Sequence, residues 1–501
     1  MKLIFTIAWR NLMRHRGKSI VIGIILFMGS ILMTVGNGFI SGMQRGLEQN
    51  IVEGFTGHLV LVSDKQEGDN VILDMMGKTV EPISNISTID SVLATQSYID
   101  KWLPIGKNMA MAINEEGGMP DYVYITGVDF DRYQKFFKGN MTPIQGRLLK
   151  PGEVGVLIPT GWQKQFCQYT NLWFNCENCP LDTAAIPPEI KKNMSDLVVK
   201  NSVVYMGMNA ENTTTDIRLG VKGIIKYRSL NNIWGSFPIV DIESYRTCMG
   251  YFSKANQSAP VSKTAMGLLS VDEKNIESFF SDAGGSESVN QEKISIVDTS
   301  RKDDINDGIY NLVLVKLKNG SKINQATASL NNLAKKDKLG LRAIPWNKAA
   351  GMLGSMAILV KVVLFTFVMF IFFVAIIIII NTLTMMAIER TTEIGMMRAV
   401  GAQKGFISSM FFAETALLSF VFGGIGIGVG VIVIRILSLL KLTSNNDFIQ
   451  IIYGGDTLQP FLSFGDLAMV ICQLIFVTLI AMAYPIIAAR RITPLEAVSR
   501  D

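Results

Sequence analysis

Two short motifs carry residues that could bind a phosphate group, the GKS tripeptide at 17–19 and the GKT tripeptide at 77–79. A phosphate-binding loop also needs a glycine five positions before the glycine of the tripeptide, so that backbone amides can surround the phosphates. Leu12 and Ile72 occupy those positions. Neither motif is therefore a nucleotide-binding loop, and we expect this chain to bind no cofactor of its own.

Residues for hydrolytic chemistry or for a metal site are equally scarce. The chain has only two histidines, His15 and His58, and it contains neither an HExxH motif nor a Gly-x-Ser-x-Gly motif. The CENC sequence at 176–179 has half of the spacing of a zinc site, but a second half is missing. We therefore expect no metal site and no catalytic centre, so that any energy-requiring function depends on a partner.

Four of the five cysteines lie in one long segment of ordinary soluble composition. In an oxidising compartment such cysteines form disulfides, and four cysteines allow three pairings. Cys167 with one cysteine of the CENC sequence, or Cys179 with Cys248, are possible bridges that the sequence does not rank. The cysteines that could take part are Cys167, Cys176, Cys179 and Cys248.

The composition indicates that part of the chain lies in lipid. Of the 501 residues 49% are hydrophobic and only 18% are charged, whereas soluble proteins have about 25% charged residues. The net charge of +5 is small for this length, which argues against a nucleic-acid partner because such binders show a concentrated basic face.

Four stretches reach the length of about 20 apolar residues that a membrane-spanning helix needs. They predict spans at 19–41, 353–388, 405–440 and 465–489. The first span is too long for the apolar core of a signal peptide and shows no convincing cleavage site, so we expect it to be retained. The predicted fold is a membrane protein with four transmembrane helices in a 1+3 arrangement and a large α+β domain, 42–352, between the first and second.

Lysine and arginine placement predicts the orientation of these spans. The basic segments are 1–18, the loop 389–404 and the tail 490–501, whereas the loop 441–464 has one lysine against two acidic residues. All three basic segments lie in the cytoplasm only if 42–352 and 441–464 lie outside it. We therefore expect a multi-pass protein of the cytoplasmic (inner) membrane with both termini in the cytoplasm.

The large external domain alternates short apolar runs with turn residues, as strands do. Strands are predicted within HLVLVS, YVYITGV, EVGVLIP, LVVKNSVVYM, GVKGIIKY, FPIVDI and YNLVLVKLKN, and a helix at 323–338. The polar, Gly/Ser-rich segment 281–293 reads as a loop, and 171–196 as an irregular insertion.

The loop 389–404 has more charges and glycines than a simple turn needs. As a helix continuing from the second span, it would place charged side chains beside a small apolar ridge, and Gly401 would end it. Such a face suits docking to another protein; the alternative is a solvated amphipathic loop. Helical spacing gives Arg390, Glu393, Ile394, Met397 and Arg398, with Gly401 at the end, and the family resemblance described next adds Glu389 and Gly395 to this candidate ATPase-coupling set.

This loop also resembles the coupling segment of ABC-transporter permeases of the FtsX/MacB/Lol superfamily, E-R-x-x-E-I-G-x-x-R-A-x-G-A followed by an Ile and a Glu, here Ile407 and Glu414. The chain start resembles the A-x-R-N-L-x-R opening of that family, and YPIIAARRITPLEA at 484–497 resembles its closing signature. The matching residues at the two ends are Ala8, Arg10, Asn11, Leu12, Arg14, Tyr484, Pro485, Ala489, Pro494, Glu496 and Ala497.

The resemblance implies a permease subunit, without catalysis of its own, that transmits movement mechanically. A pair of cytoplasmic ATPase subunits would bind ATP and Mg²⁺, and a second permease subunit, identical or homologous, would complete the complex. With four spans, this chain resembles the lipoprotein-releasing LolC/LolE group most. Its coupling segment, EIGMMRAVGA, has the general form of the superfamily and not the form that is more usual in that group. That group implies lipoprotein cargo and a periplasmic carrier. The alternatives are an efflux permease working with an adaptor and outer-membrane channel, or a non-transporting regulator of a cell-wall hydrolase.

For lipoprotein release, acyl chains would enter between the first two spans of facing subunits. Flexible and aromatic side chains suit varied apolar ligands, although each of these residues could instead face lipid or pack within the protein. The candidate residues are Met28, Leu32, Met33, Phe39, Phe365, Phe372 and Phe373.

Overall fold

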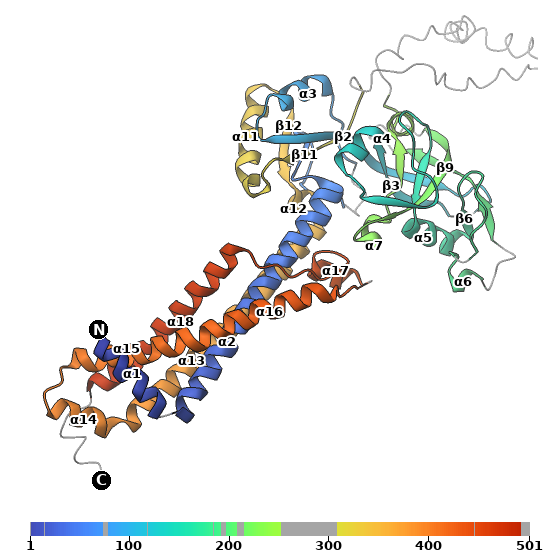
Figure 1. The fold of residues 1–501 in the computed structure, drawn as a ribbon. Coiled ribbons are helices and arrows are strands. Elements are labelled where there is room, and N and C mark those ends of the chain that lie inside the picture. The colour runs from blue at the N-terminus through green and yellow to red at the C-terminus, as the bar shows by residue number, and fades with distance from the viewer. Residues whose placement is uncertain are drawn as a thin grey trace, which may run out of the picture. The chain divides into compact units, whose positions relative to one another are not determined.

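The chain divides into a helical unit, Met1–Glu53 with Met352–Asp501, and an α+β unit, Gly54–Gly351. The computed structural model describes residues 2–14, 16–73, 79–117, 119–183, 185–191, 197–207, 215–251, 308–444 and 446–491 (Figure 1). The predicted loop 281–293 and nearly all of the tail 490–501 lie outside these ranges.

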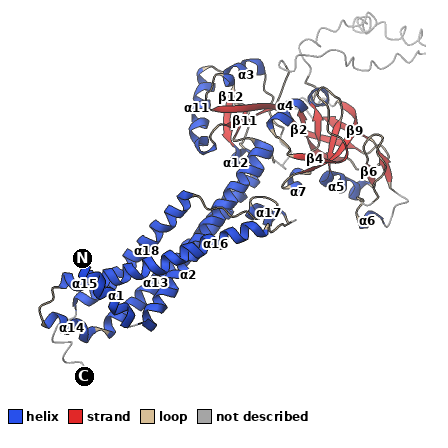
Figure 2. Cartoon of the chain, in the orientation of Figure 1, coloured by secondary structure: helices blue, strands red, loops and turns tan. Residues whose placement is uncertain are grey.

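The described part of the first unit is helical, as Figure 2 shows. Lipid offers no hydrogen-bond partner to the backbone, so long apolar segments satisfy their amides internally as helices. The elements are α1 (Lys2–Arg14), α2 (Arg16–Leu47), a π-helix (Glu48–Thr56), α13 (Met352–Glu389), α14 (Thr391–Ala399), α15 (Lys404–Leu418), a π-helical segment (Ser419–Gly423), α16 (Gly424–Leu440), α17 (Asp447–Tyr453) and α18 (Phe464–Arg491).

Four helical stretches among the described residues are long and apolar enough to cross a membrane: Ser19–Thr56, Met352–Met385, Lys404–Leu440 and Phe464–Tyr484. The first continues beyond the predicted end at 41, because Met43, Leu47, Ile51 and Val52 keep one buried face at helical spacing. The predicted loop 441–464 contains the short helix α17, on which Ile451 is buried.

Glycine allows α16 to approach α2 closely. A Cβ atom on Gly426 would lie 2.6 Å from the carbonyl oxygen of Phe27, and one on Gly430 would lie 2.7 Å from the Cβ of Thr34. Gly424 has open space at the same position. The small residues at 426 and 430 therefore form a contact within this chain, as such pairs do between membrane helices.

The second unit mixes strands and helices, as the sequence predicts. Its described elements are β1 (Leu59–Ser63), α3 (Ile86–Ala94), β2 (Ile99–Ile113), β3 (Asp121–Val128), α4 (Phe130–Phe136), β4 (Met141–Gly146), β5 (Val156–Pro159), α5 (Thr160–Thr170), β6 (Leu172–Phe174), α6 (Pro188–Lys191), β7 (Val198–Lys200), β8 (Ser202–Gly207), β9 (Asp216–Tyr227), α7 (Asn231–Trp234), β10 (Ile239–Asp241), α8 (Ile242–Cys248), β11 (Leu312–Leu317), a 3₁₀ turn (Gly320–Lys322), α11 (Ile323–Lys336), β12 (Leu341–Pro345) and α12 (Trp346–Ala349).

The long strand β2 connects the two halves of the main sheet. The strand order is β12-β1-β11-β2-β3-β10-β5-β9-β4, and β8 pairs with both β2 and β9. The first half of β2 pairs with β11, from Ile99 to Ile105, and the second half pairs with β3, from Gly106 to Ala112. In Figure 1 the helices α3 and α11 lie beside the β1–β11–β12 half.

Two glycines allow the ring of a buried tyrosine to pack directly against the sheet where the halves of β2 meet. Gly106 and Gly127 are paired across β2 and β3, and a Cβ atom on either would lie 2.1–2.3 Å from carbon atoms of Tyr245. The hydroxyl of Tyr245 donates to Asn311 Oδ1 at 2.6 Å, and Tyr245 is 0% exposed. The ring is therefore held from both ends.

Candidate functional site

The helix α14 is a separate short element between α13 and α15 (Figure 1). The prediction of one helix over 389–404 running on from the second span is wrong in this respect. Arg390 leaves the helical conformation at φ −96° and ψ 18°, and α14 ends at Ala399. Gly401 has φ +104°, a conformation that favours glycine. Gly401 therefore follows the end of the helix, as the sequence predicts.

A buried ion pair holds the start of α14 against α15. The Nη1 atom of Arg390 lies 3.0 Å from Oε2 and 3.2 Å from Oε1 of Glu414, and both side chains are at most 7% exposed. Nε of Arg390 donates to Oε2 of Glu393 at 3.1 Å. A buried charge needs a partner and further hydrogen bonds to offset its lost hydration, which accounts for the fixed position of Arg390.

The N-terminal helix α1 contributes to the same cluster. Nδ2 of Asn11 donates to Oε1 of Glu414 at 2.8 Å, and Nη1 of Arg14 lies 3.6 Å from Oε1 of Glu393. Residues of α1, the α13–α14 junction and α15 therefore share one set of polar contacts. Both Asn11 and Glu414 belong to the motifs that resemble the permease family, but no single motif shows that they touch.

Apolar packing fixes the rest of α14. Ile394 is 1% exposed and forms a cluster with Ile407, Met410 and Phe411 of α15, against which Met397 also packs. The prediction that Ile394 belongs to an exposed ridge is therefore wrong, and Gly395 is buried as well. These residues hold the helix in place and do not present it to a partner.

The outward face of α14 carries two apolar residues outside the predicted set. Met396 is 61% exposed and Val400 is 91% exposed. Val400 directly follows the end of α14, and its amide donates to the carbonyl of Met396 at 3.1 Å, so the two side chains lie on one side of the last helical turn. Their spacing was available in the sequence, but the choice between this face and the Ile394 face requires knowledge of where α15 packs.

The charged residues predicted for docking fall into two groups. Glu389 is exposed, whereas Glu393 and Arg398 are partly buried; Gly401, which carries no charge, is also exposed. Arg390 faces the protein interior. Of these charged residues, Glu393 stands three positions before Met396 and so lies next to it on the helix. An exposed apolar face with a polar neighbour suits contact with another protein.

The residues predicted to contact acyl chains do not form one surface. Met33 and Phe372 are buried in the core of the helical unit, at 4% and 8% exposure. Phe39 is partly buried. The remaining four face outward from α2 and α13: Met28 at 48%, Leu32 at 42%, Phe365 at 45% and Phe373 at 61% exposure.

The disulfide of the α+β unit lies within the CENC sequence. Cys176 is bonded to Cys179, whereas Cys167 and Cys248 are free and buried. The bridges from Cys167 to this pair and from Cys179 to Cys248 are therefore wrong, because each of the two free thiols packs separately in the interior. The bridge also excludes the CENC thiolates as zinc ligands in this state.

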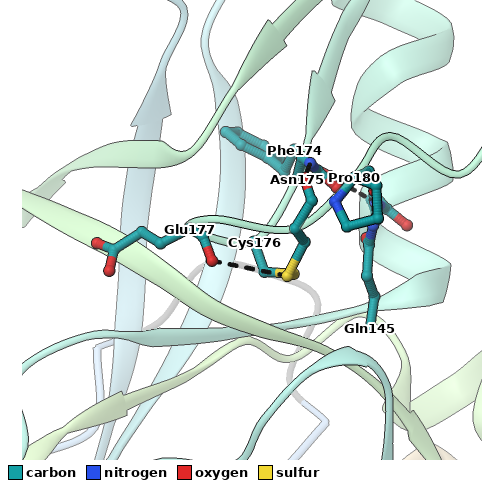
Figure 3. Close-up of a disulfide and its surroundings, with 8 residues drawn as sticks. Gln145, Phe174, Asn175, Cys176, Glu177 and Pro180 are labelled. Carbon is teal, nitrogen blue, oxygen red and sulfur yellow. Dashed lines mark hydrogen bonds between the residues drawn. A yellow bond between two sulfur atoms is a disulfide. The ribbon is translucent and has the colours of Figure 1, made fainter.

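Side chains around the disulfide fasten its loop (Figure 3). Asn175 Nδ2 donates to the carbonyl of Cys179 at 2.8 Å, and Gln145 Nε2 donates to the carbonyl of Pro180 at 2.7 Å. Lys222 Nζ lies 2.7 Å from a carboxylate oxygen of Glu177. The loop is thereby tied to β4 and β9.

The two free buried thiols should resist alkylation in the folded protein. Burial raises the pKa of Cys167 to about 11 and that of Cys248 to about 12. At neutral pH both remain protonated, and Cys167 has about 100-fold less thiolate than an unshifted thiol. We expect maleimide at pH 7 to modify both positions only after unfolding, as measured by peptide mass spectrometry. Rapid modification of Cys167 in the folded chain would contradict this prediction.

Comparison with known families supports the interpretation of the helical unit. Residues 365–494 match the family model described as FtsX-like permease C-terminal. This region is therefore similar to the C-terminal part of FtsX-like permeases. The matched region includes most of α13, all of α14 to α17, and α18. Together with the four helical stretches that are long and apolar enough to cross a membrane, this similarity supports a multi-pass membrane protein of the permease type.

One solved structure is similar to part of this chain. The chain resembles the crystal structure of the periplasmic region of MacB from Actinobacillus actinomycetemcomitans, with 12% identity and a TM-score of 0.28. The alignment covers 59% of this chain and 92% of the MacB region. A score this low carries no argument about the fold. No curated protein matches the chain.

Proposed function

We propose that α14 receives the movement of a cytoplasmic ATPase pair and that the chain transmits it mechanically. The observation that carries this proposal is the outward apolar face of Met396 and Val400 on a helix held rigidly from behind, inside the region that is similar to FtsX-like permeases. ATP and Mg²⁺ would bind to the ATPase. A second permease subunit, identical or homologous, would complete the complex.

The charge distribution supports a cytoplasmic position for α14. The segments 1–18, 389–404 and 490–501 are all basic, and positive charge collects on the cytoplasmic side of membrane proteins. In this orientation both termini lie in the cytoplasm, and Gly54–Gly351 lies outside the cytoplasmic membrane.

For the cargo we propose lipoproteins, released from the membrane to a periplasmic carrier. The exposed side chains Met28, Leu32, Phe365 and Phe373 on α2 and α13 support this proposal, because they offer flexible and aromatic contacts at the lipid boundary.

Leu32→Asp should block cargo release without preventing assembly, because a carboxylate at this depth repels acyl chains. The rate of lipoprotein release into a carrier-containing solution from proteoliposomes should fall at least about tenfold, that is by ~1.4 kcal/mol of lost stabilisation. Ile425→Asp is a matched control, because Ile425 is 54% exposed on α16. Unchanged release by the Leu32 variant would exclude these residues as the acyl-binding surface.

Mass spectrometry of the complex, gently solubilised from its native membrane, tests the whole assignment. We expect an ATPase, a permease partner and acylated proteins. If an adaptor protein copurified without acylated cargo, the function would be efflux and not lipoprotein release. If a cell-wall hydrolase copurified, the function would be regulation of that hydrolase. Absence of an ATPase would overturn the proposed function.

A further inference from the structure

We propose that Asn11 and Glu414 are positioning residues that make α1, α14 and α15 move as one body when nucleotide binds. This inference rests on the proposed function, because it assumes that an ATPase moves α14. It adds a role for α1, the N-terminal helix, which lies 403 positions from Glu414 in sequence. We call the set Asn11, Arg390, Glu393 and Glu414 the polar joint.

Glu414 is the centre of the polar joint. Its Oε1 atom accepts a hydrogen bond from Asn11 at 2.8 Å and its two oxygens accept from Nη1 of Arg390 at 3.2 and 3.0 Å. The residue is 4% exposed and lies in the stretch Lys404–Leu440, which is apolar enough to cross a membrane. One carboxylate therefore binds groups from two other elements at once.

Burial makes these contacts difficult to break one at a time. Separating a buried carboxylate from its partners leaves an uncompensated charge, which is far more costly than shifting apolar side chains past one another. The apolar cluster of Ile394, Ile407, Met410 and Phe411 could adjust to a small sliding movement of α14. The polar joint opposes that movement, so a displacement of α14 should carry α15 with it.

Asn11 extends this constraint to α1. The buried side of α1 includes Ala8 and Leu12, at 0% and 8% exposure, and Ile7 packs on the apolar cluster of α15. Asn11 places the polar contact among these apolar ones. Apolar packing alone would hold α1 against α15. The hydrogen bond from Asn11 also fixes the position of α1 along α15, because it ends on Glu414 Oε1, the atom to which Arg390 also donates. If α14 is displaced, α1 and α15 should therefore move with it in the same direction.

The test measures whether α1 and α15 keep their separation when nucleotide binds. Spin labels replace Met13 on α1 and Phe412 on α15, which are 45% and 47% exposed, in a Cys472→Ser background. Electron paramagnetic resonance then gives the distance between labels in the full permease–ATPase complex, without nucleotide and with a non-hydrolysable ATP analogue and Mg²⁺. Without further substitution, we expect one narrow distribution that is the same in both states.

Asn11→Leu should make this distance depend on nucleotide, with a change on the order of 2–5 Å, the size of helix shifts in such transitions. Glu414→Gln is a second variant that keeps the side-chain shape and removes the charge. The double variant Asn11→Asp with Glu414→Gln exchanges the amide and the carboxylate, and it should restore the nucleotide-independent distance. Trp9→Leu is a control on the exposed side of α1, where Trp9 is 52% exposed.

The outcomes separate the joint from a purely structural contact. Copurification shows whether each variant still binds the ATPase, which we expect for all of them. A broad distribution that is identical in both nucleotide states would mean that Asn11 only stabilises α1, and it would overturn the inference. An unchanged narrow distribution in both Asn11→Leu and Glu414→Gln would overturn it as well. If the unsubstituted chain binds no ATPase, the proposed function itself fails.

Discussion

Replacing Met396 and Val400 with glutamate is expected to separate the chain from its ATPase. Both side chains are exposed on α14, at 61% and 91%, so the substitutions should leave the helix folded. Carboxylates would have to be desolvated in the centre of the interface, where apolar residues supply most of the binding free energy. We expect a loss of at least about 2 kcal/mol, or ~30-fold in the dissociation constant, measured with the purified subunits.

Met119→Glu is the matched control for this experiment. Met119 is 86% exposed in the α+β unit, so the same chemical change is made at a position outside the helical unit. Its dissociation constant should equal that of the unsubstituted chain. Equal affinity of the double variant and the control would mean that the outward face of α14 is not the docking surface.

Gly106→Val is expected to destabilise the α+β unit strongly. A Cβ atom at this position would lie 2.1 Å from the ring of Tyr245, and the ring cannot turn away because its hydroxyl is bonded to Asn311. Overpacking of a filled core costs about 3 kcal/mol in such cases. For a unit of this size the loss lowers the melting temperature by about 5 °C.

Tryptophan fluorescence of the full chain can follow this transition. Five of the six tryptophans lie in Gly54–Gly351, so the signal reports mainly on that unit. Gly54→Ala is the control, because a Cβ atom on Gly54 would meet open space. If Gly106→Val melts together with the control, the close contact between β2 and Tyr245 does not constrain the fold.

Apolar patterning was sufficient to predict the long helices and most of the strands. The runs at 58–63 and 122–128 form β1 and β3, and the helical spacing at 323–338 forms α11, Ile323–Lys336. In these segments local preference and tertiary packing agree. In Figure 1, β11 and β3 flank β2, and α11 lies beside β12.

The longest strand, β2, was not predicted because its sequence lacks a strand signal. Pro104, Gly106 and Asn108 interrupt it, and all three residue types are rare in strands. Long-range contacts impose the extended conformation. Asn108 Oδ1 accepts from the amide of Val80 at 2.6 Å, and Gly106 leaves room for Tyr245. None of these partners is near β2 in sequence.

The sequence was sufficient to predict which segment forms the candidate site, but not which side chains of that segment are exposed. Spacing and family resemblance identified the loop 389–404 and its charged residues. They did not show that α15 would cover Ile394, nor that Arg390 would turn inward to Glu414. Which face of a short helix remains exposed depends on the neighbouring helix, and that information is absent from a local pattern.

Site-specific photo-crosslinking from position 396 tests the central claim most directly. A photoreactive amino acid replaces Met396 in the full chain, in its native membrane, and irradiation is followed by mass spectrometry of the crosslinked product. A second sample carries the same residue at Met119. Position 396 should crosslink to a nucleotide-binding ATPase subunit, whereas position 119 should not. Crosslinks from position 396 to lipid alone would contradict the claim that α14 is the ATPase-docking helix.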